Sequence, residues 1–548
     1  MMSPRAWLGF LVGIVVLQCC ARLQYPYTWE VLRGDVCRLS PDLLILIGLA
    51  AFGAASRRPR LWALLAALLL LMSMLFHATI DLMDVYRPDH KFELIDVPQL
   101  PWLIDLVFEQ HPVWYRNVVL SCVAIGLITL WVVLAWCFAA VARPARGSRG
   151  AYGCALVLQV LAISGVVWTS STSYRSVWGD SWLAQLADNA ARTANRLIDR
   201  EGFDRQLYKN IESAAERLDT VSHDLTKLRG ADVHLVFVES YGRFATRHAE
   251  LGPPLRSLWP SLERDLCEAG FHMRSATCYP AITGGASWLA HAQLFAGLHV
   301  TDNRLWELLM GSSLVPIPKR FAEAGYHTVE VLPAVRKDLP EAERAKVRTR
   351  AHFYGFDESL TRLEMPYDGI FYPMGEMPDQ FALHHLLERV VKPATTPLLT
   401  TFISCSSHAP FSPIPPYIED WRIDDDTFKR PPQADYHLSF FQLPDNPVAL
   451  QAYRDVIEYS LRTIVGFTCR LTRPSLVIAL GDHQPPIAAS TSVPDRSKDV
   501  VIHVFANRAE LLEPFRAMGF VEGFDVPADM VAFDTADFAQ MLFKGFAK

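Results

Sequence analysis

Hydrophobic and polar positions divide this 548-residue chain into an apolar first third and a mixed remainder. Five apolar runs fall in the first third, at Ala6–Ala21, Pro41–Ser56, Leu61–Ile80, Val118–Ala142 and Tyr152–Thr169. A membrane-spanning helix needs about 20 apolar residues, with a range of roughly 17–25, and the third and fourth runs meet this easily. The pattern therefore predicts a transmembrane domain of about five helices over residues 1–170.

The first two runs are the shortest, and the first also has the position expected of a signal peptide. However, Cys19-Cys20-Ala21-Arg22 is a poor match to a small-residue cleavage site, and four further apolar runs follow. We therefore interpret the first run as a membrane helix. The alternative is that the runs are buried helices of a large soluble core.

The links between the apolar runs differ in charge. Short Arg-rich links carry Arg57, Arg58 and Arg60 before the third run and Arg143, Arg146 and Arg149 before the fifth. The longer link from Asp81 to Trp114 mixes acidic and basic residues. Because cytoplasmic loops carry the excess of Lys and Arg, the Arg-rich links are expected in the cytoplasm. Five spans then place everything after about Ser170 on the outer side of the membrane.

Residues 171–230 are polar and contain few Gly or Pro residues. Apolar positions recur there at helical spacing, at Leu183, Leu186, Ala187, Ala190, Ala194, Leu197 and Ile198. The pattern predicts a juxtamembrane helical connector. It either lies along the membrane surface or is a solvated spacer.

From Asp232 the pattern changes to short apolar runs separated by helical patterns. The runs are Val233–Val238, Leu398–Ser404, Leu476–Leu480 and Val500–Phe505. Continuous apolar runs are typical of parallel strands that are covered on both faces. Strands that alternate with helices predict an α/β fold, here a doubly wound, mostly parallel sheet over residues 231–548. The Pro-rich stretch that begins at Pro410 and the polar segment up to Asn446 indicate a long surface insertion.

Charge and cysteine content narrow the function. The chain has a net charge of −6, whereas nucleic-acid-binding proteins are typically basic. None of its ten cysteines forms a CxxC pair, so a thiolate zinc site is not expected. Cys267 and Cys278 either form a disulfide or stay unpaired.

Candidate site residues follow three of the apolar runs, where ligands bind in open α/β sheets. Glu239 follows the first run, His408 lies shortly after the second, and Asp482 and His483 follow the third. Two carboxylates and an imidazole suit a divalent cation. Each signal is weak alone, and their joint occurrence predicts a site that moves a phosphoryl or sulfuryl group.

A candidate nucleophile lies in the stretch from Gly284 to Gly297. Ser287 has the position of the first residue of a helix, whose amide groups favour an anionic phosphate. A serine hydroxyl becomes a good nucleophile when a dication favours its alkoxide. Thr283 is the alternative nucleophile. His291 lies one turn after Ser287 and either contacts the phosphoryl group or is a core or capping residue.

Residues 232–505 resemble the alkaline phosphatase–sulfatase superfamily, in particular its membrane-bound branch of phosphoethanolamine transferases and lipoteichoic acid synthases. The matching features are Glu239, the ten-residue spacing from Ser287 to Gly297, the SHAPF stretch around His408, and the Asp482-His483 pair. The resemblance implies that Glu239, Ser287, Asp482 and His483 bind Zn²⁺ or Mn²⁺. It implies that His408, with His291, contacts the substrate.

Two departures from the family pattern bear on the chemistry. The membrane transferases use Thr as nucleophile, whereas this chain has Ser287. The sulfatases need Pro and Arg two and four residues after the nucleophile, where this chain has Leu289 and His291. Formylglycine is therefore not expected, and an unmodified serine suits phosphoryl transfer.

The resemblance and the topology together imply a transferase at the outer face of a bacterial inner membrane. It would move phosphoethanolamine or phosphoglycerol from a phospholipid to an envelope glycan or lipid through a phosphoserine. A membrane-anchored phosphodiesterase or phosphatase, or a sulfatase-like hydrolase, is an alternative in which water is the acceptor. The other alternative is a non-catalytic membrane scaffold.

Overall fold

The described residues of this computed structural model are 4–21, 40–86 without 55 and 57, 94, 97, 113–143, 157, 160 and 182–548 without 336–340, 373–376, 425, 439–442, 444–445 and 491–497. They divide into two compact units, one within residues 1–200 and one formed mainly by Glu201–Lys548. Both units contribute part of the segment that was predicted as a connector. The division into a membrane domain, a connector and a catalytic domain stays a prediction.

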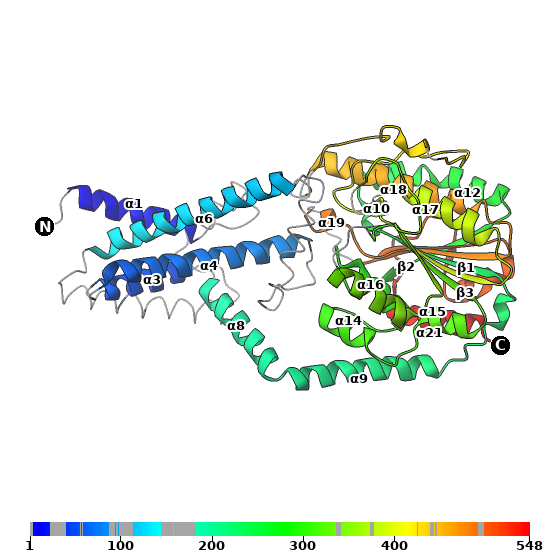
Figure 1. Cartoon of the computed structure of the whole chain (residues 1–548), viewed down its shortest axis with the longest axis horizontal. Helices are drawn as coiled ribbons and strands as arrows, with labels where there is room; N and C mark the ends of the chain where they lie inside the picture. Colours follow the sequence, from blue (N-terminus) through cyan, green and yellow to red (C-terminus); the bar gives the residue numbers. More distant parts are fainter. Residues whose placement is uncertain are drawn as a thin grey trace. The chain divides into compact units, whose positions relative to one another are not determined.

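The first unit is helical. Its helices are α1 (Pro4–Cys20), α3 (Pro41–Gly53), α4 (Pro59–Tyr86), α6 (Val113–Ala142) and α8 (Trp182–Ile198) (Figure 1). Two stretches, Pro59–Ile80 and Val113–Ala142, are long and apolar enough to cross a membrane by length and composition. The apolar helices Ala6–Cys20 and Pro41–Gly53 are shorter. The run Tyr152–Thr169 lies outside the described residues apart from positions 157 and 160, so five spans stay a prediction.

Packing within this unit joins helices that are distant in sequence. Leu17, Leu46, Leu70 and Phe138, from four different helices, are part of one buried cluster. The Asp42 carboxylate accepts hydrogen bonds from the backbone N–H groups at the start of α8. Apolar side chains are also exposed along α6, at Val118, Val123, Ile125, Ile128 and Val132. Such a surface is unusual for a helix that faces water.

The second unit is built on one mixed sheet. Its strands are β1 (Asp232–Val238), β2 (His272–Tyr279), β3 (His327–Leu332), β4 (Glu358–Thr361), β5 (Leu398–Ile403), β6 (Ser475–Gly481), β7 (Val500–Ala506), β8 (Val521–Glu522) and β9 (Phe533–Asp534). Their order is β4-β3-β5-β1-β6-β7-β2-β8, and β9 pairs with β2. The five strands from β4 to β6 are parallel, as predicted.

The prediction was wrong for the strand at Val500, which is antiparallel to both of its neighbours. Every residue of β7 is buried. A continuous apolar run reports burial on both faces of a sheet, and burial does not depend on the direction of the strand. Strands β2 to β4 were not recognised for another reason. Their alternating or polar residues resemble those of loops.

Helices cover both faces of the sheet (Figure 1). The α-helices of this unit are α9 (Arg200–Asp219), α10 (Phe244–Arg247), α11 (Gly252–Arg256), α12 (Trp259–Glu268), α13 (Ser287–Ala296), α14 (Asn303–Met310), α15 (Ile317–Glu323), α16 (Glu341–Tyr354), α17 (Asp379–Leu386), α18 (Pro447–Thr468), α19 (Pro486–Ser490), α20 (Glu513–Ala517) and α21 (Phe538–Phe546). A π-helical turn, Leu387–Val391, continues α17. One of the helical patterns predicted between the apolar runs is α18, which precedes β6.

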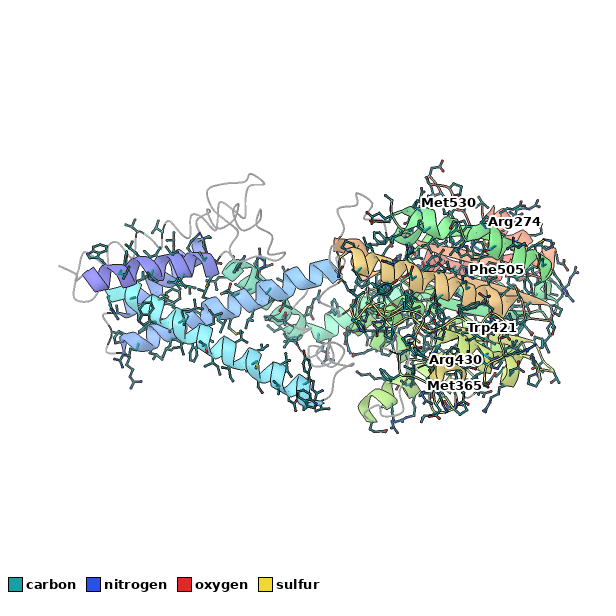
Figure 2. All side chains as sticks on the ribbon, turned by 90° about the horizontal axis from the view of Figure 1, so that it is seen from above. Arg274, Met365, Trp421, Arg430, Phe505 and Met530 are labelled. Carbon is teal, nitrogen blue, oxygen red and sulfur yellow. The ribbon has the colours of Figure 1, made fainter. Side chains whose placement is uncertain are left out.

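The insertion between β5 and α18 is more buried than predicted. Trp421, labelled in Figure 2, is 4% exposed. Its ring lies under the Arg470 guanidinium. Phe411 and Phe428 are also buried. The backbone N–H of Ile418 donates a hydrogen bond to the side chain of Gln380 in α17. Although this segment is polar overall, a few large apolar side chains are buried and pack it against the rest of the unit.

Candidate active site

The strand register brings the predicted metal ligands together. Val238 of β1 pairs with Gly481 of β6, and Phe237 pairs with Ile403 of β5. These three parallel strands therefore end at the same level. Glu239 and Asp482 follow directly, at the carboxyl edge where ligands bind in such sheets.

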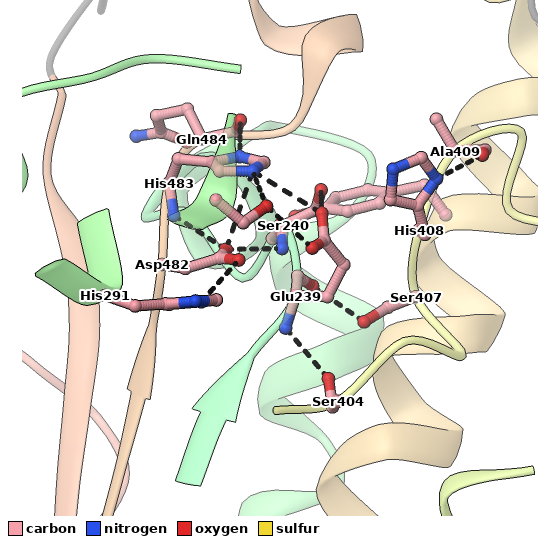
Figure 3. A network of polar contacts seen from close by, with 12 residues as sticks. Glu239, Ser240, His291, Ser404, Ser407, His408, Ala409, Asp482, His483 and Gln484 are labelled. Atoms are coloured by element: carbon pink, nitrogen blue, oxygen red, sulfur yellow. Dashed lines mark hydrogen bonds and ion pairs between the residues drawn. The ribbon is translucent and has the colours of Figure 1, made fainter. Parts of the chain in front are cut away.

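Glu239, Asp482 and His483 form a buried cluster (Figure 3). Each residue offers one ligand atom, and these atoms lie within 4.8 Å of one another. The Nε2 atom of His483 is 3.5 Å from Glu239 Oε1 and 3.8 Å from Asp482 Oδ1. Two carboxylates and an imidazole in this arrangement form a donor set for a divalent cation.

Ser287 completes the cluster as the first residue of α13. Its Oγ lies 3.0 Å from Glu239 Oε2 and 3.0 Å from His483 Nε2. The three residues before it, Gly284, Gly285 and Ala286, have φ values of 66°, 69° and 56°. Two glycines make this left-handed turn accessible, and the turn places the hydroxyl at the helix N-terminus.

The structure brings Ser287 into this cluster and not Thr283. The Thr283 hydroxyl is buried and has no hydrogen-bond partner among the described residues. The chain just before Thr283 is held by α13, because the Gln293 side chain accepts a 2.6 Å hydrogen bond from the Ala281 N–H. The geometry therefore favours Ser287 as the reactive hydroxyl.

Hydrogen bonds determine which nitrogen of each histidine is available. His483 Nδ1 lies 2.8 Å from the Gln484 carbonyl oxygen, which only accepts. Nδ1 must therefore carry the proton, and the lone pair of Nε2 faces Ser287 and Glu239. His408 has the same arrangement, with Nδ1 2.6 Å from the Ala409 carbonyl oxygen.

His408 lies beyond Glu239, on the loop after β5 (Figure 3). It is half-buried and is not part of the group that can hold a metal ion. The loop is tied to Glu239 at two points. Ser404 Oγ accepts from the Glu239 N–H at 2.9 Å, and Ser407 Oγ donates to the Glu239 carbonyl oxygen at 2.7 Å. Asp379 accepts hydrogen bonds from the backbone of Cys405 and Ser406 in the same loop.

His291 is buried below the cluster. Its Nε2 lies 3.7 Å from Asp482 Oδ2, and its ring packs on Phe237 with a centroid distance of 4.3 Å. Its predicted contact with a phosphoryl group stays a prediction.

The electrostatics of the cluster fit a cation. Burial, with the charge of Asp482, raises the pKa of Glu239. Burial also acts to raise the pKa of Asp482, but the charges of His483 and His291 outweigh it and lower that pKa. In the described part of the chain, no Lys or Arg pairs with either carboxylate. Two adjacent buried acids without such a partner are costly unless a cation joins them.

One oxygen of the cluster also lacks a partner. Asp482 Oδ1 accepts hydrogen bonds from the N–H groups of Ser240 and His483, each at 2.8 Å. Asp482 Oδ2 is buried and has no hydrogen-bond partner among the described residues. Buried polar atoms are normally satisfied, so this orphan oxygen supports the assignment of the cluster to a metal ion.

Sequence reasoning missed several residues that support the cluster. Ser240 has a φ of 57° and donates from Oγ to Glu239 Oε1 at 2.7 Å. Its carbonyl oxygen accepts a 2.8 Å hydrogen bond from Tyr453 in α18. The adjacency of Ser240 to Glu239 was the one signal available. Nothing local indicates Tyr453 or Ser404, because their partners are distant in sequence. Ser407 belongs to the SHAPF stretch, but that stretch does not indicate its contact with Glu239. Cys267 and Cys278, considered as a disulfide, are both free.

No protein-family model and no curated protein sequence matches the chain. Solved structures similar to it include members of the group that its motifs resemble. The integral membrane protein lipooligosaccharide phosphoethanolamine transferase A (EptA) of Neisseria meningitidis is 12% identical with a TM-score of 0.42, over 98% of this chain and 95% of that one.

Two further solved structures that are similar to this chain are a phosphoglycerol transferase in a ligand complex and a periplasmic domain in a zinc complex. The phosphoglycerol transferase GacH of Streptococcus pyogenes, in complex with sn-glycerol-1-phosphate, is 13% identical with a TM-score of 0.37, over 61% of this chain and 81% of that one. The zinc complex of the C-terminal periplasmic domain of EptC from Escherichia coli is 12% identical with a TM-score of 0.34, over 57% and 80%. With TM-scores below 0.5, these similarities do not by themselves indicate an activity.

Proposed function

We propose that this chain is a metal-dependent transferase. It moves a phosphoethanolamine or phosphoglycerol group from a phospholipid to an envelope glycan or lipid, through a phosphoserine at Ser287. The main supporting observation is the position of Ser287 Oγ, 3.0 Å from both Glu239 Oε2 and His483 Nε2 at the start of α13. The two possible groups follow from the resemblance of the motifs.

Glu239, Asp482, His483 and Ser287 would hold the divalent ion, Zn²⁺ or Mn²⁺, since their oxygen and nitrogen donors suit either. When bound, the ion supplies positive charge that favours the serine alkoxide and the phosphate oxygens. The amide groups at the start of α13 favour the same anionic phosphate.

The residues of the chain then account for a two-step exchange. Ser287 Oγ loses its proton to solvent water and attacks phosphorus, a bond forms between Oγ and phosphorus, and the bond from phosphorus to the diacylglycerol oxygen breaks. His408 is suited to protonate that leaving oxygen, because its Nδ1 is engaged by Ala409 and its Nε2 stays available. One positioned acid contributes about 10²–10⁴-fold.

In the second step, an acceptor hydroxyl attacks phosphorus, the bond to Ser287 Oγ breaks, and Oγ regains a proton from solvent water. His408 Nε2 takes the proton of the acceptor, which restores the starting state. If water replaced the acceptor alcohol, the same residues would make a hydrolase. Residues 231–548 would lie on the outer side of a bacterial inner membrane, beside the lipid donor.

The test is to trap the intermediate. Full-length protein in detergent is incubated with headgroup-labelled phospholipid, and the peptide containing Thr283 and Ser287 is analysed by mass spectrometry. We expect a mass increase on Ser287 that identifies the transferred group, its loss in Ser287→Ala, and its retention in the matched variant Thr283→Ala. A labelled adduct that persists in Ser287→Ala would contradict the proposal.

The same incubation separates the alternatives. A label that moves to an added glycan or lipid acceptor supports the transferase, and a label released as the free headgroup phosphate supports a hydrolase. A protein that binds no Zn²⁺ or Mn²⁺ and forms no adduct would be a scaffold.

A further inference from the structure

Two buried polar atoms next to the metal cluster face each other without hydrogen bonds. They are His291 Nε2 and Asp482 Oδ2, and neither has a hydrogen-bond partner among the described residues. They lie 3.7 Å apart, on side chains that are 5% and 0% exposed. This distance is just beyond a hydrogen bond, so a small rotation of either group would form one.

A direct contact of His291 with substrate fits this geometry poorly. The imidazole is buried and packs on the Phe237 ring. Its Nε2 faces the carboxylate of Asp482 (Figure 3). A phosphate oxygen at Nε2 would have to take the place now held by Asp482 Oδ2. Two buried anions would then share one side of the imidazole.

A second metal ion between the two atoms also fits poorly. Only two donors converge there, and stable sites need three or more protein ligands. A nitrogen that can donate and an oxygen that can accept, 3.7 Å apart, are instead suited to a hydrogen bond with each other.

We infer that His291 is a positioning residue for the metal site. Its Nε2–H donates to Oδ2 of Asp482 and holds that carboxylate in the orientation that binds the divalent ion. Carboxylates that ligate metals are normally held by such outer hydrogen bonds. The inference rests on the proposed function in one respect, since it requires that a metal ion binds at Glu239, Asp482 and His483.

Helix α13 explains why this contact is rigid. Ser287 opens the helix, and His291 lies four residues later on the same face. Gln293 of the same helix binds both Ala281 and Asp534. One short helix thus supplies the nucleophile with its first residue and orients a metal ligand with the next turn.

The experiment measures metal affinity. Full-length protein is stripped of metal with a chelator, and Zn²⁺ and Mn²⁺ are then titrated in competition with a chromophoric chelator. The informative variants are His291→Gln, which places an amide nitrogen near the position of Nε2, and His291→Asn, whose shorter amide does not reach it. His291→Phe removes both ring nitrogens and keeps most of the volume.

We expect His291→Asn and His291→Phe to bind metal about 10–100-fold more weakly than the native chain, and His291→Gln within about 3-fold. The matched control is His234→Phe, which changes another buried histidine, on β1, whose Nδ1 bonds to Thr400. It should keep the native metal affinity. Thermal unfolding identifies any variant that does not fold. The metal affinities of His291→Gln and His291→Asn then show whether an amide nitrogen at the position of Nε2 is enough.

Two results would overturn the inference. One is equal metal affinity in all three His291 variants, and the other is an affinity of His291→Gln as low as that of His291→Phe. If the native chain itself binds neither ion, that result contradicts the proposed metal-dependent function and not only the role of His291. The two failures are therefore distinguishable.

Discussion

The two ends of strand β1 carry buried acids with different partners. Asp232 begins the strand, and Arg473 binds it with two nitrogens, Nε at 2.6 Å from Oδ2 and Nη2 at 3.0 Å from Oδ1. The Leu398 N–H adds a third hydrogen bond at 2.9 Å. Glu239 follows the strand at its other end, where its ionisable neighbours are Asp482 and His483.

The difference separates an acid that stabilises the fold, Asp232, from an acid that binds a ligand, Glu239. A buried carboxylate needs a compensating charge. At the first end the chain supplies it as an arginine, and the acid is satisfied without any ligand. At the second end the described residues supply another acid, a neutral imidazole and a hydroxyl. That set is completed by an external cation.

The largest expected effect comes from removing the charge of Glu239. Glu239→Gln should reduce transfer by about 10²–10³-fold or more, because an electrostatic group at the reacting centre is lost. The free energy of unfolding of the metal-free protein should be equal or higher. Burial and Asp482 raise the pKa of Glu239, so its ionised form destabilises the metal-free fold at neutral pH.

Headgroup transfer and chemical denaturation after chelator treatment measure the two quantities. The same variant should also lose the rise in Tm that Zn²⁺ or Mn²⁺ gives the native protein. A stability loss as large as the activity loss would show that Glu239 is structural, like Asp232.

Asp232→Asn should have the reverse profile. It leaves the Arg473 guanidinium without its partner, and breaking a buried ion pair costs about 3–5 kcal/mol. The lower value is expected here, since the Arg473 side chain is 27% exposed. Transfer per folded molecule, and metal affinity, should stay close to those of the native chain.

The double variant Asp232→Asn/Arg473→Met sharpens this test. Replacing both partners of an ion pair is often nearly neutral, so it should recover much of the lost stability. Denaturant unfolding of the native chain, both single variants and the double variant measures the coupling. Additive single and double effects would refute the pairing.

Both ends of this strand were partly predictable from the sequence. Val233–Val238 is a continuous apolar run with an acid directly after it, and Leu476–Leu480 is followed by Asp482 in the same way. Parallel pairing of such runs suffices to bring Glu239 and Asp482 to one edge. The position of Ser287 as the first residue of a helix was also predicted, and α13 begins there.

Other features depend on information that a local pattern does not contain. The antiparallel direction of β7 is set by its neighbours, since its apolar residues only require burial. The contact of His291 with Asp482 depends on the rotation of α13 about its axis. Arg473 lies 241 positions from Asp232, and nothing near either residue marks them as partners.

The smallest expected effect concerns His234, which lies between the two ends of β1. Its ring is buried, and Nδ1 is 2.8 Å from Thr400 Oγ1. Burial, with the charge of Arg473 in support, lowers the pKa of His234 to about 3. Between that pH and about 6.5, the unfolded chain binds a proton that the folded chain does not. The stabilising effect of neutral His234 is therefore complete above pH 6.5 and declines as the pH falls, by about 1.4 kcal/mol per pH unit.

His234→Phe should remove this dependence. Between pH 7 and pH 5, we expect the variant to lose about 2 kcal/mol less stability than the native chain, although it starts from a lower value without the Thr400 hydrogen bond. Denaturant unfolding of the metal-free proteins at both pH values measures the difference, and metal-free protein keeps ligand binding at Glu239 out of the comparison. His503 is a matched second case, because burial also lowers its pKa to about 3. If the native chain and His234→Phe lost equal stability over this range, the imidazole would have to be protonated within the fold, and the middle of β1 would then hold a charge that neither end compensates.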